Sequence, residues 1–348
     1  KIMKSVLHVG PIHSKGGMSR TIQEMISNPP DGWNSHALES HVDGSIFSKF
    51  STWRNSLRNI ENLTHDLGVD IIHVHTASDI SWMRKRTYIK RSIKLGIPVI
   101  VSIHAGNFHN FCKTGLGFFG ADVKRLLNKE EVTTVFLTNR SRENNFPWSV
   151  GNVRVIPNFI SKNGKKDDLE ERKFGRLLFI GRDSKEKRVP LAVEIANRIS
   201  SRGYDTSLVL AGIDHKSRSL RGAMEYANIE PKGWLSKDSV SDLISSSWAL
   251  IVTSEYEALP MAVIEAMSSG LPVFGSGCIE GIFEDSGSII ESSDPDVWAS
   301  KIIETLEDPA SWKKMSDSGP SESTKFESQK VREQWAELYN SLVVKRNS

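Results

Sequence analysis

The chain has 348 residues, of which 38% are apolar and 25% charged, and its net charge is only +3. This length predicts two domains, and the composition excludes a disordered chain. No apolar run approaches the roughly 18 residues of a membrane-spanning helix. Two distant cysteines are too few for a disulfide framework, so we expect a globular protein of the reducing cytoplasm.

Strand and helix signals alternate through the first half of the chain. The opening apolar stretch, Val6–Gly10, predicts a strand rather than a signal peptide, and a glycine-rich turn then leads into a helix over 19–27. This alternation continues and indicates a parallel sheet that helices cover on both faces. The further elements predicted here are strands at 70–75, 98–104, 133–138 and 153–156, and a helix over 81–95.

The alternation stops at a charged segment and then starts again. Residues 161–175 have no apolar period, which predicts a linker between an N-terminal domain over 1–160 and a C-terminal domain over 176–325. The tail, 326–348, predicts an amphipathic helix. The second domain is predicted to contain strands at 176–180, 207–211, 249–253 and 272–274, and helices over 191–201, 260–269 and 295–306.

The first half is the more basic, with 20 Lys and Arg residues against 12 Asp and Glu residues in 1–160. Its most basic segment, 82–95, contains six of these cations and no acid, while Trp82, Ile89 and Ile93 form a stripe at helical spacing. Two interpretations stay open. The segment is either an amphipathic helix on anionic lipid or an ordinary sheet-covering helix with a solvated basic face. No motif accompanies the charge that would indicate nucleic acid as a partner.

The segment 253–272 has the richest chemistry of the second half. Glu257 lies in the loop after a predicted strand, and Glu265 lies inside the helix that follows. The helix start at Leu259, Pro260 and Met261 offers unpaired N–H groups and a partial positive charge, which suit a diphosphate. The two carboxylates would then bind hydroxyls on either side of it. Alternatively, both acids are solvated surface residues.

A second group of polar residues follows the strand at 176–180. Gly181 and Arg182 come directly after the strand, and Lys187 follows five residues later. Glycine allows a ligand to approach the backbone closely, and cations stabilise the charge that develops on a departing diphosphate. The alternative is that both are solvated surface cations, as most Lys and Arg residues are.

Together these residues resemble the nucleotide-sugar signature of glycosyltransferase family 4. In this chain the signature reads Gly181-Arg182-x4-Lys187 and Glu257-x7-Glu265-Ala-Met-x-x-Gly270-x-Pro272. The resemblance implies an α/β protein of the GT-B fold, with two Rossmann-like domains facing across a cleft and a C-terminal helix crossing back to the first domain. It also implies that Arg182 and Lys187 bind the diphosphate, Glu257 the sugar and Glu265 the ribose.

First-half positions resemble the family more loosely. Gly16 and Gly17 match its glycine-rich loop near the donor, and His104, after the strand at 98–104, matches its histidine beside the transferred sugar. His75 and Arg20 are assigned to the acceptor on the same basis; alternatively, His75 is a structural histidine of its strand. Trp234 aligns with a segment near the nucleotide base. The stretch Phe274–Gly281 departs from the family pattern at the sugar pocket.

The resulting expectation is a retaining hexosyltransferase that needs no metal or cofactor. Its donor is a nucleotide sugar that carries a hexose or N-acetylhexosamine; UDP is the favoured nucleotide, and GDP is the open alternative. Its acceptor is a glycan or a lipid-linked glycan in bacterial surface polysaccharide synthesis. Asp294 and Asp296 imitate a metal motif but flank Pro295, which predicts a helix start instead. Two other functions stay open: an epimerase or hydrolase of the same fold, and a non-catalytic nucleotide-sugar-binding protein.

Overall fold

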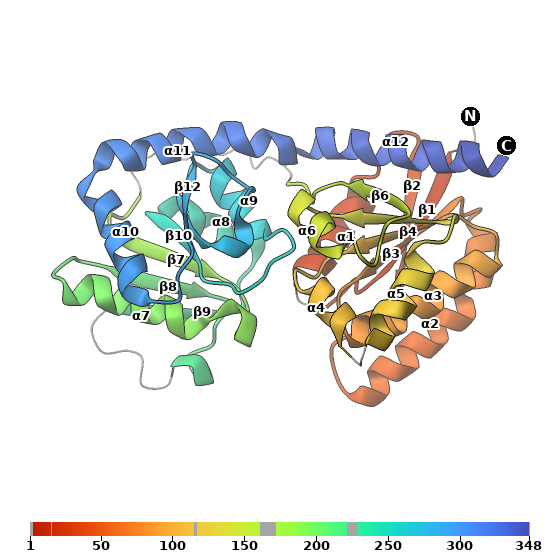
Figure 1. Cartoon of the computed structure of the whole chain (residues 1–348), viewed down its shortest axis with the longest axis horizontal. Helices are drawn as coiled ribbons and strands as arrows, with labels where there is room; N and C mark the ends of the chain where they lie inside the picture. Colours follow the sequence, from red (N-terminus) through yellow and green to blue (C-terminus); the bar gives the residue numbers. More distant parts are fainter. Residues whose placement is uncertain (1–2, 15, 115–116, 161–171, 221–227, 348) are drawn as a thin grey trace. The chain divides into compact units, whose positions relative to one another are not determined.

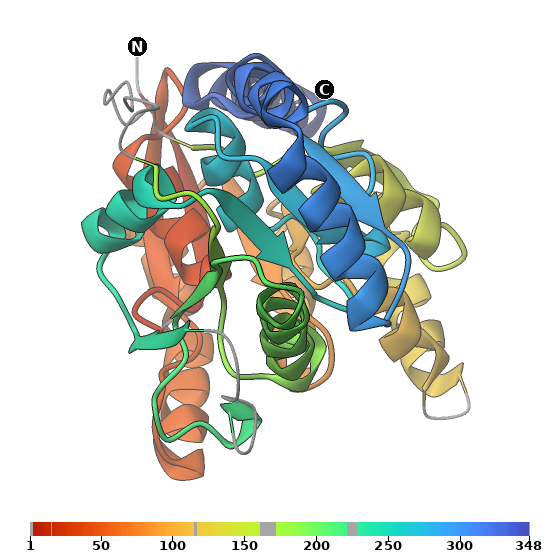
Figure 2. The same cartoon turned by 90° about the vertical axis from the view of Figure 1, so that its left-hand side faces the viewer.

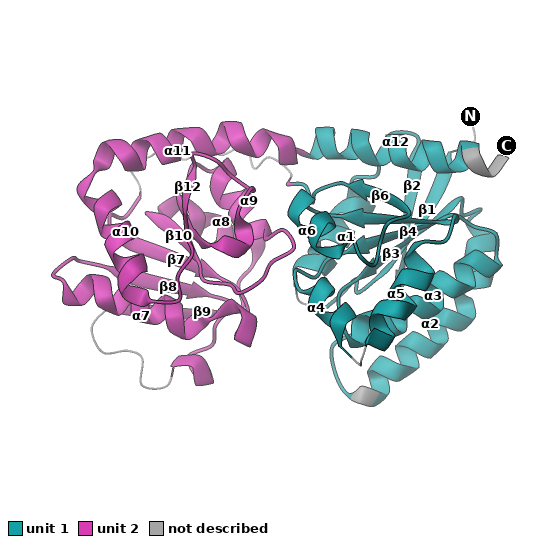
Figure 3. Ribbon diagram, in the orientation of Figure 1, with its two compact units in different colours: residues 1–159, 328–348 teal, residues 160–327 magenta. Residues whose placement is uncertain are grey.

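The computed structural model describes residues 3–14, 16–114, 117–160, 172–220 and 228–347. The chain divides into two compact units (Figure 3): unit 1 contains residues 1–159 and 328–348, and unit 2 contains residues 160–327. Most of the predicted linker, from 161 to 171, lies outside the described residues. No helix of the described ranges is both long enough and apolar enough to cross a bilayer.

Unit 1 is built on a six-stranded parallel sheet with the order β2-β1-β3-β4-β5-β6. β1 therefore lies between the strand that follows it and β3, so the sheet extends in opposite directions from the β1–β3 pair. The strands are β1 Lys4–Gly10, β2 Trp33–Glu39, β3 Ile71–Thr76, β4 Val99–Ile103, β5 Val132–Phe136 and β6 Asn152–Val155.

Helices cover both faces of this sheet (Figure 1). One face packs its alternate side chains, such as Leu7, Val74 and Val101, with the buried faces of α2, α3, α4 and α5. The opposite face, which includes Val6 and Ile71, packs against α1 and α12. The helices are α1 Gly17–Ser27, α2 Ile46–Asp66, α3 Ile80–Lys94, α4 Phe108–Lys113, α5 Phe118–Leu127, α6 Asn139–Asn145 and α12 Ser328–Asn347.

The C-terminal helix α12 belongs to the core of unit 1, although it follows unit 2 in the chain. Its buried residues Val331, Trp335, Leu338 and Tyr339 all lie in the cluster under the α1-side face of the sheet. The Trp335 ring also lies 4.7 Å from the ring of His73 on β3. Burial of this apolar stripe attaches the end of the chain to the first sheet.

Unit 2 is a second six-stranded parallel sheet, with the order β12-β11-β10-β7-β8-β9. Its helices α7 and α10 pack together with one face of the sheet (Figure 2), and α9 packs against α11. The elements are β7 Arg176–Ile180, α7 Val189–Ser201, β8 Ser207–Ala211, β9 Asn228–Gly233, α8 Lys237–Ser246, β10 Ala249–Val252, α9 Met261–Ser268, β11 Val273–Ser276, β12 Gly287–Ile290, α10 Pro295–Glu307 and α11 Pro309–Ser323.

Each sheet has a point at which the strand order reverses. In unit 2 it lies between β7 and β10, and in unit 1 between β1 and β3. Loops that follow the two central strands diverge there to opposite faces, which leaves a crevice at the carboxyl edge where ligands bind in such folds. A binding site is therefore expected among the residues that follow β7, β10, β1 and β3.

The basic helix α3 corrects one interpretation of the sequence. Trp82 and Ile89, predicted to form a lipid-facing stripe, are fully buried in the core of unit 1. Lys85, expected on a solvated face, is only 1% exposed and donates a hydrogen bond to Ser40. The alternation of apolar and basic residues thus reflects packing on the sheet, and the apolar side is not available to lipid.

Asp294 caps α10 by accepting from the Asp296 N–H at 2.9 Å, as expected of a helix start.

Candidate functional site in two sheet edges

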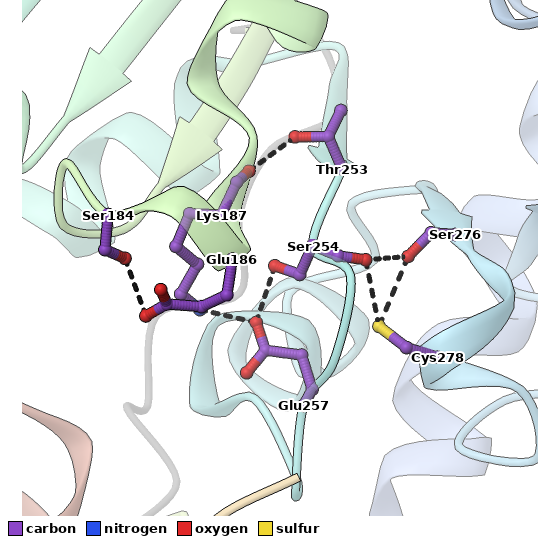
Figure 4. Close-up of polar contacts among 8 residues, drawn as sticks. All are labelled: Ser184, Glu186, Lys187, Thr253, Ser254, Glu257, Ser276 and Cys278. Atoms are coloured by element: carbon purple, nitrogen blue, oxygen red, sulfur yellow. Dashed lines mark hydrogen bonds and ion pairs between the residues drawn. The ribbon is translucent and has the colours of Figure 1, made fainter. Parts of the chain in front are cut away.

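Lys187 and Glu257 form an ion pair at the carboxyl edge of the unit 2 sheet (Figure 4). Lys187 ends a short 3-10 turn, Lys185–Lys187, after β7, and Glu257 lies in the loop after β10. Their side chains are 20% and 13% exposed, so the pair is largely shielded from water. Because β7 and β10 flank the reversal point, the sheet places this pair where a ligand is expected. The sequence predicted both residues but not their contact.

Hydrogen bonds join the two loops that carry this pair. Thr253 donates its hydroxyl to the Lys187 carbonyl at 2.8 Å, and the Glu255 N–H donates to the Glu186 carbonyl at 2.7 Å. Ser254 donates to the same Glu257 oxygen that Lys187 contacts, at 2.7 Å. The carboxylate is therefore held by two donors from two loops.

Ser276 and Cys278 support the Glu257 loop from the next strand. The Ser276 hydroxyl and the Cys278 thiol both donate to the Ser254 carbonyl, the thiol at 3.2 Å (Figure 4). Both residues lie in the stretch that departs from the family pattern. The sequence indicates no role for either residue, because both donate to a backbone atom that is distant in sequence.

The remaining residues of the 253–272 segment lie as the sequence indicates. Helix α9 begins at Met261 with Pro260 as its N-cap, and Glu265 lies one turn further along, half-buried. Leu259 is buried, at 5% exposure, so its side chain serves packing while its backbone precedes the helix. The N-terminal amides of α9 thus follow the Glu257 loop directly.

Gly181 lies beside Phe179 and the lysine of the pair. A Cβ at this position would crowd the Phe179 ring, at 3.2 Å, and would lie at ordinary contact distance, 3.5 Å, from Lys187 Cδ. Arg182 follows in the same loop with an exposed side chain, and Trp234, just after β9, is 53% exposed. The structure therefore joins Lys187 to Glu257, whereas Arg182 and Trp234 are positioned at strand ends without entering that ion pair.

In unit 1 the predicted glycine-rich loop leads into α1. Gly16 is the N-cap with a φ of 142°, a conformation that favours glycine, and Gly17 is the first residue of the helix. Arg20, one turn later, is half-buried. The carboxylate of Glu39 accepts from the Ile12 and His13 N–H groups, which fixes the backbone before this loop.

Three histidines form a hydrogen-bonded row at the reversal point of the unit 1 sheet. His8 Nδ1 lies 3.1 Å from His75 Nε2, and His75 Nδ1 lies 3.0 Å from His104 Nε2. The rings come from β1, from β3 and from the residue after β4. His8 and His75 are buried, whereas His104 is half-buried. The sequence predicted site residues at His75 and His104. It did not predict His8, because only the pairing of β1 with β3 brings His8 beside His75.

His73 stacks on His75 with a ring separation of 4.1 Å, but it has different partners. Its Nδ1 lies 3.0 Å from the Tyr339 hydroxyl and its Nε2 lies 2.7 Å from the Ser102 hydroxyl. One nitrogen each of His8, His73 and His75 lies close enough together for three metal ligands. Since both ring nitrogens of His73 and His75 already have protein partners, the geometry fits a hydrogen-bonded cluster better than a metal centre.

Burial keeps these rings neutral. It lowers the pKa of His8 to about 3, and burial together with nearby Lys85 lowers the pKa of His104 to about 4. Burial likewise holds the pKa values of His73 and His75 well below 6.5, with smaller contributions from the neighbouring histidines. Burial also lowers the pKa of Lys85 to about 7. The unit 1 edge is therefore polar but nearly uncharged.

Comparison with known proteins finds relatives in sequence and in fold. Residues 161–322 match the family described as glycosyl transferases group 1. A glycosyltransferase of amylovoran biosynthesis from Erwinia amylovora is 25% identical over 186 residues, which cover 50% of this chain and 52% of that protein. The chain thus matches about half the length of this relative.

Two solved structures have the same fold. A sucrose-phosphate synthase from Thermosynechococcus elongatus is 15% identical, with a TM-score of 0.81 over 98% of this chain and 100% of its own. A protein from Anabaena, solved in complex with UDP and glucose, is 14% identical, with a TM-score of 0.74 over 97% of this chain and 99% of its own. These likenesses confirm the predicted class of two Rossmann-like α/β domains.

The histidine cluster predicts that the protein loses stability in mild acid. In the unfolded chain each histidine titrates near pH 6.5, whereas in the folded chain the pKa values of His8 and His104 are about 3 and 4. Below pH 6.5 the unfolded state therefore binds more protons, and the free energy of unfolding falls as pH falls. Each buried histidine contributes up to about 1.4 kcal/mol per pH unit.

Urea unfolding of the full chain at pH 7.5 and 5.5 measures this effect. His73→Phe should reduce the difference between the two pH values, because it removes one buried histidine. The control His65→Gln, at a side chain that is 91% exposed, should leave the difference unchanged. Equal stability of the unaltered protein at both pH values would contradict the assignment.

Proposed function

We propose that this chain, whose residues 161–322 match the glycosyl transferases group 1 family, transfers a hexose or N-acetylhexosamine, with retention, from a UDP-sugar to a glycan or lipid-linked acceptor. The observation that carries the proposal is the Lys187–Glu257 pair at the reversal point of the unit 2 sheet. The family implies retention of anomeric configuration. The Anabaena neighbour solved with UDP and glucose supports UDP over GDP.

In this proposal unit 2 binds the donor. The diphosphate lies at the N-terminus of α9, where backbone N–H groups and the helix dipole favour an anion. Glu265, further along α9, accepts from the ribose, and Trp234 lies near the base. Gly16 and Gly17 form the loop of unit 1 that is assigned to the donor, and Arg20 is assigned to the acceptor. His75, expected from the sequence to bind the acceptor, is fully buried and uses both ring nitrogens on His8 and His104, so it does not contact the acceptor directly.

Lys187 supplies the charge that the departing diphosphate needs. As the bond between the anomeric carbon and the phosphate oxygen breaks, negative charge grows on that oxygen, and a preorganised ammonium stabilises it. Arg182 is the second cation assigned to this charge. The acceptor oxygen bonds the anomeric carbon from the same side, and its proton passes to the leaving phosphate. With Lys187 in this role, the proposal requires no metal or cofactor.

Glu257 has two tasks in this scheme. It holds the Lys187 ammonium in place, and it binds a hydroxyl of the sugar. One carboxylate oxygen receives both Lys187 and Ser254, yet a carboxylate has about four acceptor positions, so capacity for a substrate hydroxyl remains. His104, as a neutral ring, contacts another sugar hydroxyl.

The proposed location is the cytoplasm, with an acceptor that is either free or carried by lipid. Because the apolar side of α3 is buried, any contact with anionic membrane would rest on exposed cations such as Lys94 rather than on insertion. No partner role for nucleic acid is proposed.

Product analysis with candidate UDP-sugars and glycan acceptors, in the presence of EDTA, tests the function. The proposal expects free UDP only when acceptor is present, and an α- or β-linked product that keeps the donor's anomeric configuration. UDP release without acceptor would favour a hydrolase, and a changed donor sugar would favour an epimerase. Donor binding without any product would favour a non-catalytic binding protein.

Lys187→Ala is expected to lower turnover at saturating donor at least about tenfold, since the leaving group loses its cation. The matched control is Lys185→Ala, which removes an exposed lysine from the same short turn and should leave turnover within about twofold. Near-normal turnover of Lys187→Ala would remove this lysine from the mechanism.

Glu265→Ala is expected to weaken donor binding more than it changes turnover. A hydrogen bond to a charged group contributes about 1.5–3 kcal/mol, so the donor dissociation constant should rise about tenfold or more. Isothermal titration with the UDP-sugar measures it, and Glu194→Ala on the exposed side of α7 is the control. An unchanged dissociation constant would exclude Glu265 from ribose binding.

A further inference from the structure

We propose that His75 and His8 are positioning residues for His104: the three rings form one row that couples the tautomer of the neutral His104 ring to those of His75 and His8, with Nε2 engaged and Nδ1 left for a substrate hydroxyl. The inference rests on the proposed function, because that function gives His104 its hydroxyl contact. It adds two residues, one of them from β1, to the machinery of unit 1.

The three rings of the row are connected through their nitrogens. His75 uses both of its ring nitrogens on other histidines, Nε2 toward His8 at 3.1 Å and Nδ1 toward His104 at 3.0 Å. A neutral imidazole has one N–H donor and one acceptor nitrogen. If His8 donates to His75, then His75 must donate to His104. If His104 donates, the whole row runs the other way. The tautomers of the three rings are therefore set together.

The surroundings keep the row free of charge. His73 stacks on His75, His36 on β2 and Lys85 on α3 lie near the row, and no acid is among the groups that act on His75 or His104. Burial lowers the pKa of each ring in the row, so a proton added at neutral pH would have no compensating carboxylate. His104 thus faces its ligand as a neutral donor or acceptor.

His73, the nearest histidine outside the row, has only structural partners. It lies on the same strand and the same face as His75, and both are fully buried. Yet its nitrogens go to the hydroxyls of Ser102 and Tyr339, within the core between sheet and α12. The row of His8, His75 and His104 instead leads from the middle of the sheet to the carboxyl edge at its reversal point, where ligands bind.

The neutral His104 ring suits a hydroxyl, rather than an anion, as its hydrogen-bond partner. A sugar hydroxyl both donates and accepts, so it pairs with Nδ1 whichever way the row runs. A neutral ring offers no charge to a phosphate, which leaves the diphosphate to Lys187 in unit 2. The row therefore selects the polar, uncharged part of the substrate.

The direct test is nitrogen NMR of the full chain labelled with 15N-histidine at pH 7.5, with His104→Gln to assign the signals. The unaltered protein should show His104 with one protonated and one unprotonated nitrogen. His75→Phe keeps a buried ring but removes both nitrogens, so the His104 signals should move toward the average of two tautomers. His73→Phe is the matched control and should leave them in place.

Two further variants keep the test decisive if His75→Phe does not fold. His8→Phe removes the far end of the row and should also shift the His104 signals, whereas His75→Gln, whose amide donates and accepts, should restore them in part. His104 signals that stay the same in His8→Phe and His75→Gln, or that move equally in His73→Phe, would overturn the proposal.

Kinetics give the second measurement. Loss of one hydrogen bond to the substrate should lower kcat/KM about tenfold in His75→Phe, with His73→Phe within about threefold of the unaltered protein. The NMR result does not depend on activity, so a protein that shows the coupled tautomers but no transferase activity would sink the proposed function and keep the row. Normal kcat/KM in His75→Phe would overturn the positioning role.

Discussion

The contact between Lys187 and Glu257 is the interaction on which the arrangement of the unit 2 loops, and the chemistry proposed for them, depends. Each side chain is less than a quarter exposed, and a charge so shielded needs a partner of opposite sign. The two residues come from loops that diverge at the reversal point, so their ion pair ties the loops together across it. The hydrogen bonds donated by the Thr253 hydroxyl and the Glu255 N–H reinforce this tie, and Ser254 sets the carboxylate orientation.

The two units place different electrostatics at equivalent sheet edges. Unit 2 presents a cation, a carboxylate and a helix N-terminus, which suits a diphosphate and the charge that develops on it. Unit 1 presents neutral imidazoles whose pKa values burial has lowered. The same fold therefore supports a charged site in one unit and an uncharged polar site in the other, through the side chains that follow corresponding strands.

Periodicity predicted the elements that are buried on a regular face and missed those that are not. β7 and β10 were found because their residues are mostly apolar and are bounded by polar ones. β2 buries Trp33 and Leu38, five positions apart, so it has no alternation to detect. α8 buries only Ile244 among many serines. The membrane interpretation of α3 was wrong in its apolar half because spacing cannot tell a face that packs on a sheet from one that faces lipid.

The sequence by itself determined most of the strands along the chain, the residues that follow them, and the family signature that contains Lys187, Glu257 and Glu265, because these are local properties of spacing and residue type. Only the tertiary structure decided that Lys187 contacts Glu257 and that His8 joins His75 and His104. Both depend on which strands pair, and parallel pairing brings together residues about 70 positions apart that no local pattern connects.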